Sequence, residues 1–459
     1  MSSSRQPVSP MSRSERRAAV GLAGIFALRM LGLFLILPVF ALHAEGLPGT
    51  TPLLIGLAIG AYGLTQALLQ IPFGMLSDRI GRKPVIFGGL ILFAIGSVVA
   101  ALADDIQGVI LGRVLQGSGA IAAAVMALAA DLTREEVRTR AMAGIGVSIG
   151  MAFALALVLG PVLAQGIGLD GIFWFTALLA LGGILILALV VPTPDHSSVH
   201  RDAEPVASQI RGVLAQRELL RLDFGVLTLH MLMTSLFLVV PLSLAAAGLA
   251  AAHHWWVYLP VLVLSMVAMV PFIIQAESKG RMKPVFLGAV LVLVLALVGL
   301  YELRSGIASL AIFLFLFFTA FNLLEASLPS LISKIAPAGA KGTAMGVFST
   351  SQFAGAFFGG LLGGWVHQEY GEGAVFLFCA AAAVVWFLVA STMGSPRRVS
   401  SRVIRVGAVG ASDGPVLQHR LLEIPGVEEA LVTEEGLAYL KVDNRRLDWA
   451  RLQAFSAGA

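Results

Sequence analysis

Residues 71–85 read IPFGMLSDRIGRKPV, and residues 270–285 read VPFIIQAESKGRMKPV. The two stretches correspond residue by residue until one inserted residue, Met282, after which Lys83 aligns with Lys283. In both copies the segment is a short charged link between two long apolar runs. A duplication of this kind predicts a membrane protein built from two related halves, a plan that many secondary transporters share.

The composition indicates a chain that is largely surrounded by lipid. Hydrophobic residues make up 58% of it and charged residues 13%, whereas a soluble domain carries about 25% charged residues. The net charge of +4 does not indicate nucleic-acid binding, because the basic residues lie in the links between apolar runs. Cys379 is the only cysteine, which excludes intrachain disulfides and a cysteine metal site. We expect neither a metal ion nor a cofactor.

Twelve apolar runs are each long enough for a spanning helix, which needs about 20 residues. They do not alternate between polar and apolar residues as barrel strands would, so helices must satisfy their backbone groups in lipid. The runs cover roughly 18–42, 52–76, 84–103, 106–131, 138–165, 170–191, 219–247, 255–276, 284–303, 307–333, 342–367 and 373–393. The predicted fold class is an all-α polytopic membrane protein, with twelve transmembrane helices in two pseudo-symmetric six-helix bundles.

Positive charges occupy every second link between the runs. These links contain Arg79, Arg82 and Lys83; Arg134, Arg138 and Arg140; Arg201, Arg211 and Arg217; Lys279, Arg281 and Lys283; and Lys334 and Lys341. Because Lys and Arg are retained in the cytoplasm, this pattern places the basic links and both ends of the chain on the cytoplasmic side.

The chain divides into segments of different composition. They are a cytoplasmic N-terminus at 1–17, a first bundle at 18–191, a linker at 192–217, a second bundle at 218–394 and a cytoplasmic tail at 401–459. The tail is charged, with alternation and turns, and predicts a small α+β ferredoxin-like domain in the order β-α-β-β-α, without an obvious last strand. The second part of the linker is interpreted either as a helix on the membrane surface or as a loose solvated segment.

The first charged link carries a motif whose members have separate physical roles. They are Gly74, Asp78, Arg79, Gly81, Arg82 and Lys83. Gly74 permits the close approach of another helix, and Gly81 permits a tight turn. An acid such as Asp78 suits the positive N-terminus of another helix, and Arg82 is expected to pair with Asp131. Such contacts would close the cytoplasmic side. The alternative is that the basic residues only set the topology.

Glu325, Arg29 and Arg113 lie within apolar runs, where a charged side chain costs at least about 2.5–3.5 kcal/mol and is a functional candidate. Burial disfavours the charged form of a carboxyl, so Glu325 is a candidate proton carrier, with Arg29 as its expected counter-charge. The alternative is a static pair of Glu325 with Arg29 or Asn322 that orders the core. Arg113 either contributes to proton coupling or extends its side chain to the outer surface.

Four polar side chains in the apolar runs are candidates for lining a substrate cavity. They are Asn322, His230, Gln66 and Gln116. For His230, a hydrogen-bonded position in the core is the more common alternative.

Residues 74–83, GMLSDRIGRK, resemble the most diagnostic motif of the major facilitator superfamily, G-x-L-x-D-R-x-G-R-K. RVLQGSG at 113–119 resembles a motif of its proton-coupled members, and Gly160-Pro161 partially resembles a motif of its antiporters, with a packing kink as the alternative. Over residues 15–395 the chain is similar to the drug:proton antiporter group. The tail resembles small heavy-metal-associated domains but lacks their cysteine pair. The resemblance implies that Asp78 meets the start of the eleventh helix near Gly342.

The resemblance and the buried acid together predict a proton-coupled secondary transporter of the bacterial inner membrane. We expect an exporter, or antiporter, of small amphipathic or drug-like molecules that works by alternating access as a monomer. Its expected partners are protons, a small-molecule substrate and the lipid bilayer. A proton-coupled metabolite importer or symporter is the first alternative, and a non-transporting membrane sensor with the tail as its output is the second. The sequence carries no nucleophile–base arrangement or phosphate loop that would predict an enzyme.

Overall fold

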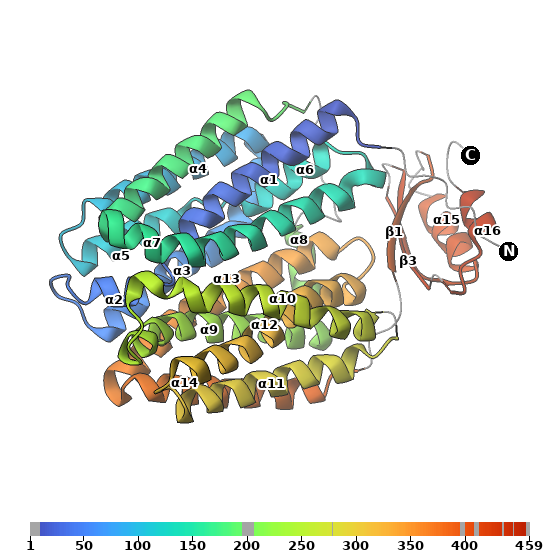
Figure 1. Cartoon of the computed structure of the whole chain (residues 1–459). Helices are drawn as coiled ribbons and strands as arrows, with labels where there is room; N and C mark the ends of the chain where they lie inside the picture. Colours follow the sequence, from blue (N-terminus) through green and yellow to red (C-terminus); the bar gives the residue numbers. More distant parts are fainter. Residues whose placement is uncertain are drawn as a thin grey trace.

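The computed structural model describes residues 10–194, 206–277, 279–394, 400–407, 413–433, 436–443 and 445–455. Two helical bundles lie against each other, and a small α/β domain lies at one end of both (Figure 1). Residues 1–9 of the predicted N-terminal segment, and residues 195–205 of the predicted linker with Arg201, lie outside the described residues.

The first bundle contains α1 (Arg13–Phe34), α2 (Phe40–Ala44), α3 (Pro52–Ile80), α4 (Arg82–Ala101), α5 (Ile106–Ser118), α6 (Ala122–Asp131) and α7 (Glu135–Leu189). The linker contributes α8 (Ala207–Leu214). The second bundle contains α9 (Arg217–Ala246), the short 3-10 helix η1 (Ala251–His253), α10 (Trp255–Glu277), α11 (Met282–Glu302), α12 (Ile307–Ile335), α13 (Lys341–Tyr370) and α14 (Glu372–Ser391).

Within the described residues, ten helical stretches are long and apolar enough to cross a membrane. The longest, Arg140–Leu189, contains Gly168 at φ 70°, which is not helical and divides α7 into two crossing segments. α13 is not among the ten, because its many glycines lower its hydropathy, but it is 30 residues long and packs between α3 and α9. Dividing α7 and counting α13 gives the twelve segments that the sequence predicts.

Two crossing segments are interrupted by short non-helical breaks. Residues 35–39, which include Pro38, separate α1 from α2, and residues 119–121 separate α5 from α6. A proline has no N–H to continue the helical hydrogen bonds. A Cβ at Gly160 would lie 2.6 Å from the carbonyl oxygen of Leu35 in the first break. Gly160 is therefore needed for close packing here, which accounts for it without reference to a direction of transport.

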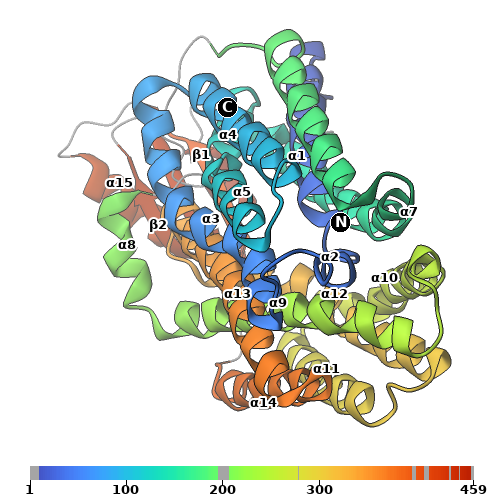
Figure 2. The same ribbon diagram turned by 90° about the vertical axis from the view of Figure 1, so that its left-hand side faces the viewer.

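The two bundles meet along α3 and α13, which lie side by side between them (Figure 2). A Cβ added at Gly56 would lie 2.1 Å from the carbonyl oxygen of Gly360, so only glycine allows this approach. α3 begins at Pro52, directly after an outer link, so the contact lies in the outer half of the membrane. We call this contact the outer seal; its residues are Gly56, Gly60 and Gly63 of α3, and Phe353, Phe357, Gly360 and Gly364 of α13. The structure is closed on the outer side.

A second glycine face of α13 packs against α9 within the second bundle. Cβ atoms at Gly355 and Gly359 would lie 2.1 Å from the carbonyl oxygen of Leu227 and 2.4 Å from that of Met231. The hydroxyl of Ser235 donates to the carbonyl of Gly359 at 2.8 Å. α13 therefore contacts α9 on one face and the opposite bundle on the other, and a displacement of this helix affects both contacts.

Each of the duplicated links contains a glycine with a positive φ. Gly81 lies at φ 97° between α3 and α4, and Gly280 lies at φ 66° between α10 and α11. A positive φ is readily adopted by glycine alone, because other residues carry a Cβ. The predicted tight turn and the predicted duplication are both confirmed.

The tail forms a three-stranded antiparallel sheet in the order β1-β3-β2. Its elements are β1 (Ser400–Arg405), α15 (Asp413–Leu422), β2 (Val427–Val432), β3 (Leu437–Val442) and α16 (Trp449–Gln453). Buried Leu421 of α15 and Leu440 of β3 belong to its own small core. This is the predicted β-α-β-β-α order, and within the described residues a fourth strand is absent. α16 begins at Trp449, because Asp448 caps it by accepting from the N–H of Arg451 at 3.1 Å.

The open face of the tail sheet contacts the link between α12 and α13. Lys441 of β3 is only 4% exposed, and its Nζ donates to the carbonyl of Ile335 at 3.0 Å. Glu429 of β2 accepts from the N–H of Ala338 at 3.0 Å. A lysine on the free face of a sheet would normally extend into solvent, so its burial shows that the membrane domain covers this face.

The linker helix α8 contacts the same region from another direction. Gln209 donates to the carbonyl of Gly339 at 3.2 Å and accepts from the hydroxyl of Thr343 at 2.9 Å. The second part of the linker is therefore helical. The alternative interpretation, a loose solvated segment, does not apply to residues 207–214. α8 thus binds both the first turn of α13 and the link before it, and the tail binds the same link.

Candidate functional site

Glu325 lies within α12, and its carboxylate joins a polar cluster inside the second bundle. The side-chain amide of Gln352 on α13 donates to Oε1 of Glu325 at 3.3 Å, and Nε2 of His230 on α9 lies 3.7 Å from Oε2. Among the described residues, Oε2 is a buried oxygen without a hydrogen-bond donor. The side chain as a whole is 38% exposed. The carboxylate is therefore partly reached by solvent and incompletely compensated.

His230 has a defined tautomer in this cluster. Its Nδ1 lies 3.2 Å from the carbonyl oxygen of Val226, one turn earlier on α9, and a carbonyl only accepts hydrogen bonds. Nδ1 therefore carries the proton, and Nε2 of the neutral ring is an acceptor. The amide nitrogen of Gln352 lies 2.8 Å from this Nε2 and donates to it. The sequence assigned His230 to a cavity or to the core, whereas the structure places it beside Glu325.

Two buried arginines and a tyrosine form a second polar cluster, inside the first bundle. Arg29 is 1% exposed, and its Nη2 donates at 2.8 Å both to Oε1 of Gln66 and to the carbonyl of Gly119. The carbonyl of Gly119 can accept from a side chain because the chain is not helical between α5 and α6. The guanidinium carbons of Arg29 and Arg113 lie 5.7 and 5.2 Å from the ring centroid of Tyr62, within cation–π range.

Arg113 does not extend to the outer surface, which was the alternative for it. It is 1% exposed, and it donates to Oε1 of Gln116 at 2.6 Å and to the carbonyl of Ala58 at 3.3 Å. Gln116 in turn donates to Ser97 at 2.8 Å. Gln66 and Gln116 are both fully buried. In this structure they bind arginines rather than line an open space.

The structure does not bring Arg29 and Glu325 together, although the sequence suggested this pair. Arg29 binds Gln66 and Gly119 in one bundle, and Glu325 contacts His230 and Gln352 in the other. The suggested pair of Asn322 with Glu325 is also replaced, because the amide of Asn322 donates to Ser265 of α10 at 3.0 Å. These two pairs do not form because each helix turns its polar residues toward neighbours that cannot be read from their positions in the sequence.

The cytoplasmic motif forms a compact charged cluster. Arg82 pairs with Asp131 at 3.4 Å, as predicted, and both side chains are at least 98% buried. Arg82 also pairs with Asp78 and donates to the hydroxyl of Ser77 at 2.8 Å. Asp78 is thus bound within its own link rather than at the start of α13 near Gly342. Arg79 is exposed and Gly74 is buried, as a topological charge and a close helix contact require.

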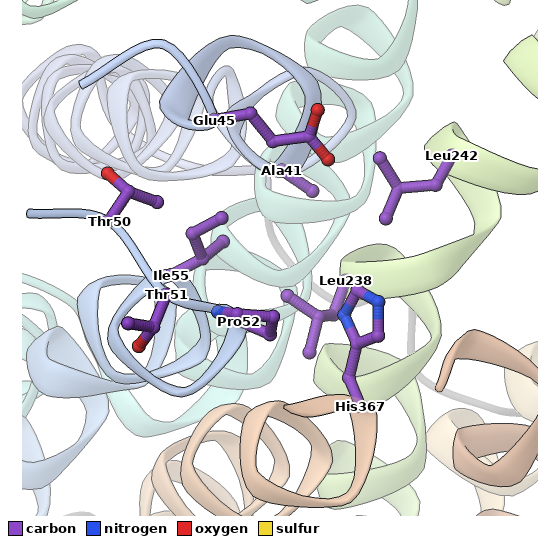
Figure 3. Close-up of a pocket in the computed structure, with 9 residues that line it drawn as sticks. All are labelled: Ala41, Glu45, Thr50, Thr51, Pro52, Ile55, Leu238, Leu242 and His367. Carbon is purple, nitrogen blue, oxygen red and sulfur yellow. The ribbon is translucent and has the colours of Figure 1, made fainter. Parts of the chain in front are cut away.

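A pocket of about 210 Å³ opens between the bundles on the outer side (Figure 3). It is lined by Ala41, Glu45, Thr50, Thr51, Pro52 and Ile55 of the first bundle and by Leu238, Leu242 and His367 of the second. Pockets for drug-sized ligands hold about 300–1,000 Å³. The pocket is therefore too small for such a ligand, and it lies on the outer side of the seal.

Several interacting residues were not apparent from the sequence. Gln352 lies in a polar and glycine-rich part of α13, and its role depends on which neighbours that helix faces. Glu15 accepts from Nε of Arg134 at 2.8 Å and ties the start of α1 to the link before α7. A capping box, Ser12 with Glu15, was the available signal for that acid. Within the described residues, the structure contains no group of three or more His, Cys, Asp or Glu side chains suited to hold a metal ion.

The twelve segments, the paired bundles and the charged link define a family of membrane transporters. The sequence profile of the Major Facilitator Superfamily matches residues 22–359. The chain belongs to this superfamily and is a multi-pass membrane transporter.

Individual relatives agree with this assignment. The inner membrane transport protein YajR of Escherichia coli (strain K12) is 52% identical over 436 residues, which are 95% of this chain and 96% of the relative. The multidrug resistance protein MdtH of Aeromonas salmonicida (strain A449) is 25% identical over 343 residues, 74% of this chain and 85% of the relative. This chain is likewise an inner membrane protein.

A solved structure shows the same fold at low sequence identity. A bacterial homologue of the human lysosomal transporter Spinster, in an inward-facing and occupied conformation, superposes with a TM-score of 0.68 at 14% identity. The match covers 84% of this chain and 98% of that one.

Proposed function

We propose that this chain is a proton-coupled transporter that exports small amphipathic molecules by alternating access. The observation that carries the proposal is the carboxylate of Glu325, which lies inside the membrane domain with one oxygen buried and with Nε2 of His230 3.7 Å away. A carboxylate in this position is costly when charged, and proton uptake removes that cost.

The driving force would come from protons that move down their gradient. The membrane potential alone supplies about 2.3 kcal/mol per proton for each 100 mV. A proton on Glu325 changes the charge between α9, α12 and α13, and α13 also forms the outer seal. Proton binding at this place therefore acts on the helix whose position decides whether the outer side is closed. The chain would work as a monomer, since both bundles of the seal come from one chain.

The export direction is supported by a relative, and the amphipathic class of substrate is supported by the surroundings of His230. The A. salmonicida relative is named a multidrug resistance protein, and over residues 15–395 the chain is similar to the drug:proton antiporter group. The polar cluster of the second bundle offers few hydrogen-bond donors, with Phe321 packed 5.9 Å from the ring of His230. Aromatic surfaces with few polar groups suit amphipathic ligands better than sugars or amino acids.

Proteoliposome transport tests the proposal. We expect an imposed pH gradient to drive movement of ethidium, a probe for amphipathic cations, in the opposite direction to protons, and Glu325→Gln to abolish this movement. Glu302→Gln, at the exposed end of α11, is the matched control. Undiminished proton-driven movement in Glu325→Gln would remove Glu325 from the mechanism. Ethidium moving in the same direction as protons would favour the importer or symporter.

The arrangement of the tail supports a sensor as the second candidate. Both α8 and the tail bind the link before α13, so a ligand of the tail would act next to a helix of the outer seal. A sensor needs no proton flux. Signalling lost on deletion of residues 401–459, together with absent proton movement in proteoliposomes, would support this function over transport.

A further inference from the structure

Gln352 is the side chain that connects two titratable groups in the second bundle. Its amide nitrogen lies 2.8 Å from Nε2 of His230 and 3.3 Å from Oε1 of Glu325. The other polar neighbour on α12, Asn322, is bound to Ser265 of α10. Among the described residues, His230 is the titratable group that pairs with Glu325. Gln352 therefore donates one hydrogen bond to each member of the pair.

This hydrogen-bond pattern fits one protonation state. When His230 is neutral, Nε2 accepts from Gln352, because Nδ1 is bound to the carbonyl of Val226. When Nε2 is protonated, it becomes a donor and faces the donating amide of Gln352. The amide must then turn or withdraw, and Oε1 of Glu325 loses its donor. A proton entering the pair therefore changes the contacts of Gln352.

The next residue on α13 connects this cluster to the opposite bundle. The ring of Phe353 lies 6.3 Å from that of Tyr62 on α3, in an edge-on arrangement. A Cβ added at Gly63 of α3 would lie only 2.6 Å from the carbonyl oxygen of Phe353. Tyr62 in turn lies beside the buried guanidiniums of Arg29 and Arg113. A displacement at Gln352 is therefore transmitted, through one peptide unit, to the outer seal and to the arginines.

We propose that Gln352 is the positioning residue that couples protonation of the Glu325–His230 pair to opening of the outer seal. The inference rests on the proposed proton-coupled function and adds the residue that links its proton site to its moving contact. In the neutral state, Gln352 holds α13 to α9 and α12, in the position where Phe353 contacts α3. After proton uptake, the donor–donor conflict releases that position.

Electron spin resonance distances across the seal test this inference without a known substrate, because the proton is the ligand. Spin labels at Asp104→Cys and Glu369→Cys, both exposed at the outer ends of opposite bundles, report opening in a Cys379→Ala background. The full chain in lipid nanodiscs is titrated between about pH 5 and 9, where histidine and its neighbours change charge. We expect the long-distance population to change with a single midpoint.

Gln352→Met has nearly the same volume but removes both hydrogen bonds. Without a donor to Glu325 and with an unoccupied acceptor on His230, the pair binds protons more readily, so the midpoint should move up by at least about one pH unit. Gln352→Asn, which keeps the amide but is too short to reach both partners, should move it in the same direction and serves if the Met variant fails to fold. Gln368→Met, on the exposed outer end of the same helix, should leave the midpoint unchanged.

The outcomes separate this inference from the proposed function. A wild-type seal that responds to pH, with an unchanged midpoint in both Gln352 variants, overturns the inference alone. If the spin-label distances across the outer seal of the wild-type protein do not change with pH, both the proton-coupled function and the inference are overturned. An upward shift in the Gln352 variants but not in Gln368→Met supports the coupling role, because a merely structural residue would change stability without moving the midpoint.

Discussion

Lys83 and Lys283 make the same contact in the two halves of the molecule. Nζ of Lys83 donates to the carbonyl of Val191 at 2.6 Å, and Nζ of Lys283 donates to the carbonyl of Met393 at 2.6 Å. Each carbonyl lies two residues beyond the last residue of the final helix of its bundle, α7 or α14. Each lysine thus binds the start of the third crossing segment of its bundle, α4 or α11, to the end of the sixth, where a cation is favoured by the helix dipole.

Replacing either lysine should weaken its own bundle by a similar amount. Lys83→Met and Lys283→Met each remove a cation from a helix C-terminus, which costs about 0.3–1 kcal/mol at exposed sites and up to about 2 kcal/mol when partly buried. Thermal unfolding of the purified protein should show a similar decrease in melting temperature for both. Arg79→Met, exposed on the same link, is the control. A decrease as large in the control would contradict the specific role of the lysines.

A single methyl group should open the outer seal. In Gly56→Ala the new Cβ would lie 2.1 Å from the carbonyl oxygen of Gly360, so α3 and α13 must separate. We expect the labelled pair at 104 and 369 to shift toward longer distances. Gly88→Ala, on α4, meets nothing within 4 Å among the described atoms and should behave as wild type. Identical distance distributions in Gly56→Ala and wild type would show that the contact can adapt without opening.

The buried Arg82–Asp131 pair should show strong coupling in a double-mutant cycle. Asp131→Asn removes the buried carboxylate that pairs with the guanidinium of Arg82, and breaking a buried pair costs about 3–5 kcal/mol. The double variant Asp131→Asn with Arg82→Gln should lose less unfolding free energy than the two single variants together. The difference should be about 1–3 kcal/mol, because the two side chains act as one pair.

The second half provides a contrast for this cycle. Lys334 and Glu277 pair at 2.9 Å, but their side chains are 26% and 46% exposed. Because solvent screens such a pair, Lys334→Gln should cost less than about 1 kcal/mol in the same unfolding measurement. Equal losses for Asp131→Asn and Lys334→Gln would mean that burial does not strengthen the first pair.

Undocking of the tail should expose the link before α13. Lys441→Ala and Glu429→Ala together remove the two side-chain contacts to Ile335 and Ala338. Hydrogen exchange of the amide of Ala338 should accelerate at least about tenfold, because each tenfold change corresponds to only about 1.4 kcal/mol of lost protection. Glu423→Ala, at an exposed position directly after α15, should leave it unchanged. Unchanged exchange in the double variant would show that other contacts hold the tail.

Much of the membrane domain was predictable, because its determinants are local in the sequence. Apolar length gives the crossing segments, and the repeated link gives the two halves. Gly81 and Gly280 mark the turns, since only glycine takes their backbone conformation readily. The pair of Arg82 with Asp131 followed from charges at helix ends on one side of the membrane. These features depend on the order of residues and on the lipid solvent, not on which helix faces meet.

The polar clusters were less predictable, because they depend on helix rotation. Arg29 and Glu325 were matched by opposite charge, but their helices turn them toward Gln66 in one bundle and toward His230 and Gln352 in the other. Asp78 was expected at the start of α13, but that contact belongs to a closed cytoplasmic side, whereas here the outer side is closed. The alternating access proposed above would require the same sequence to support both packings.

The sequence by itself determined that this chain is a duplicated, lipid-embedded bundle with both ends on the cytoplasmic side, because hydropathy and positive charge act segment by segment. Only the tertiary structure decided that Gln352 bridges Glu325 and His230, and that α13 carries this cluster and the outer seal on adjacent residues. The physical reason is that hydrogen bonds and glycine contacts between helices require backbones to approach within a few ångströms. That approach is set by the packing of all the helices together and by the state in which they are packed.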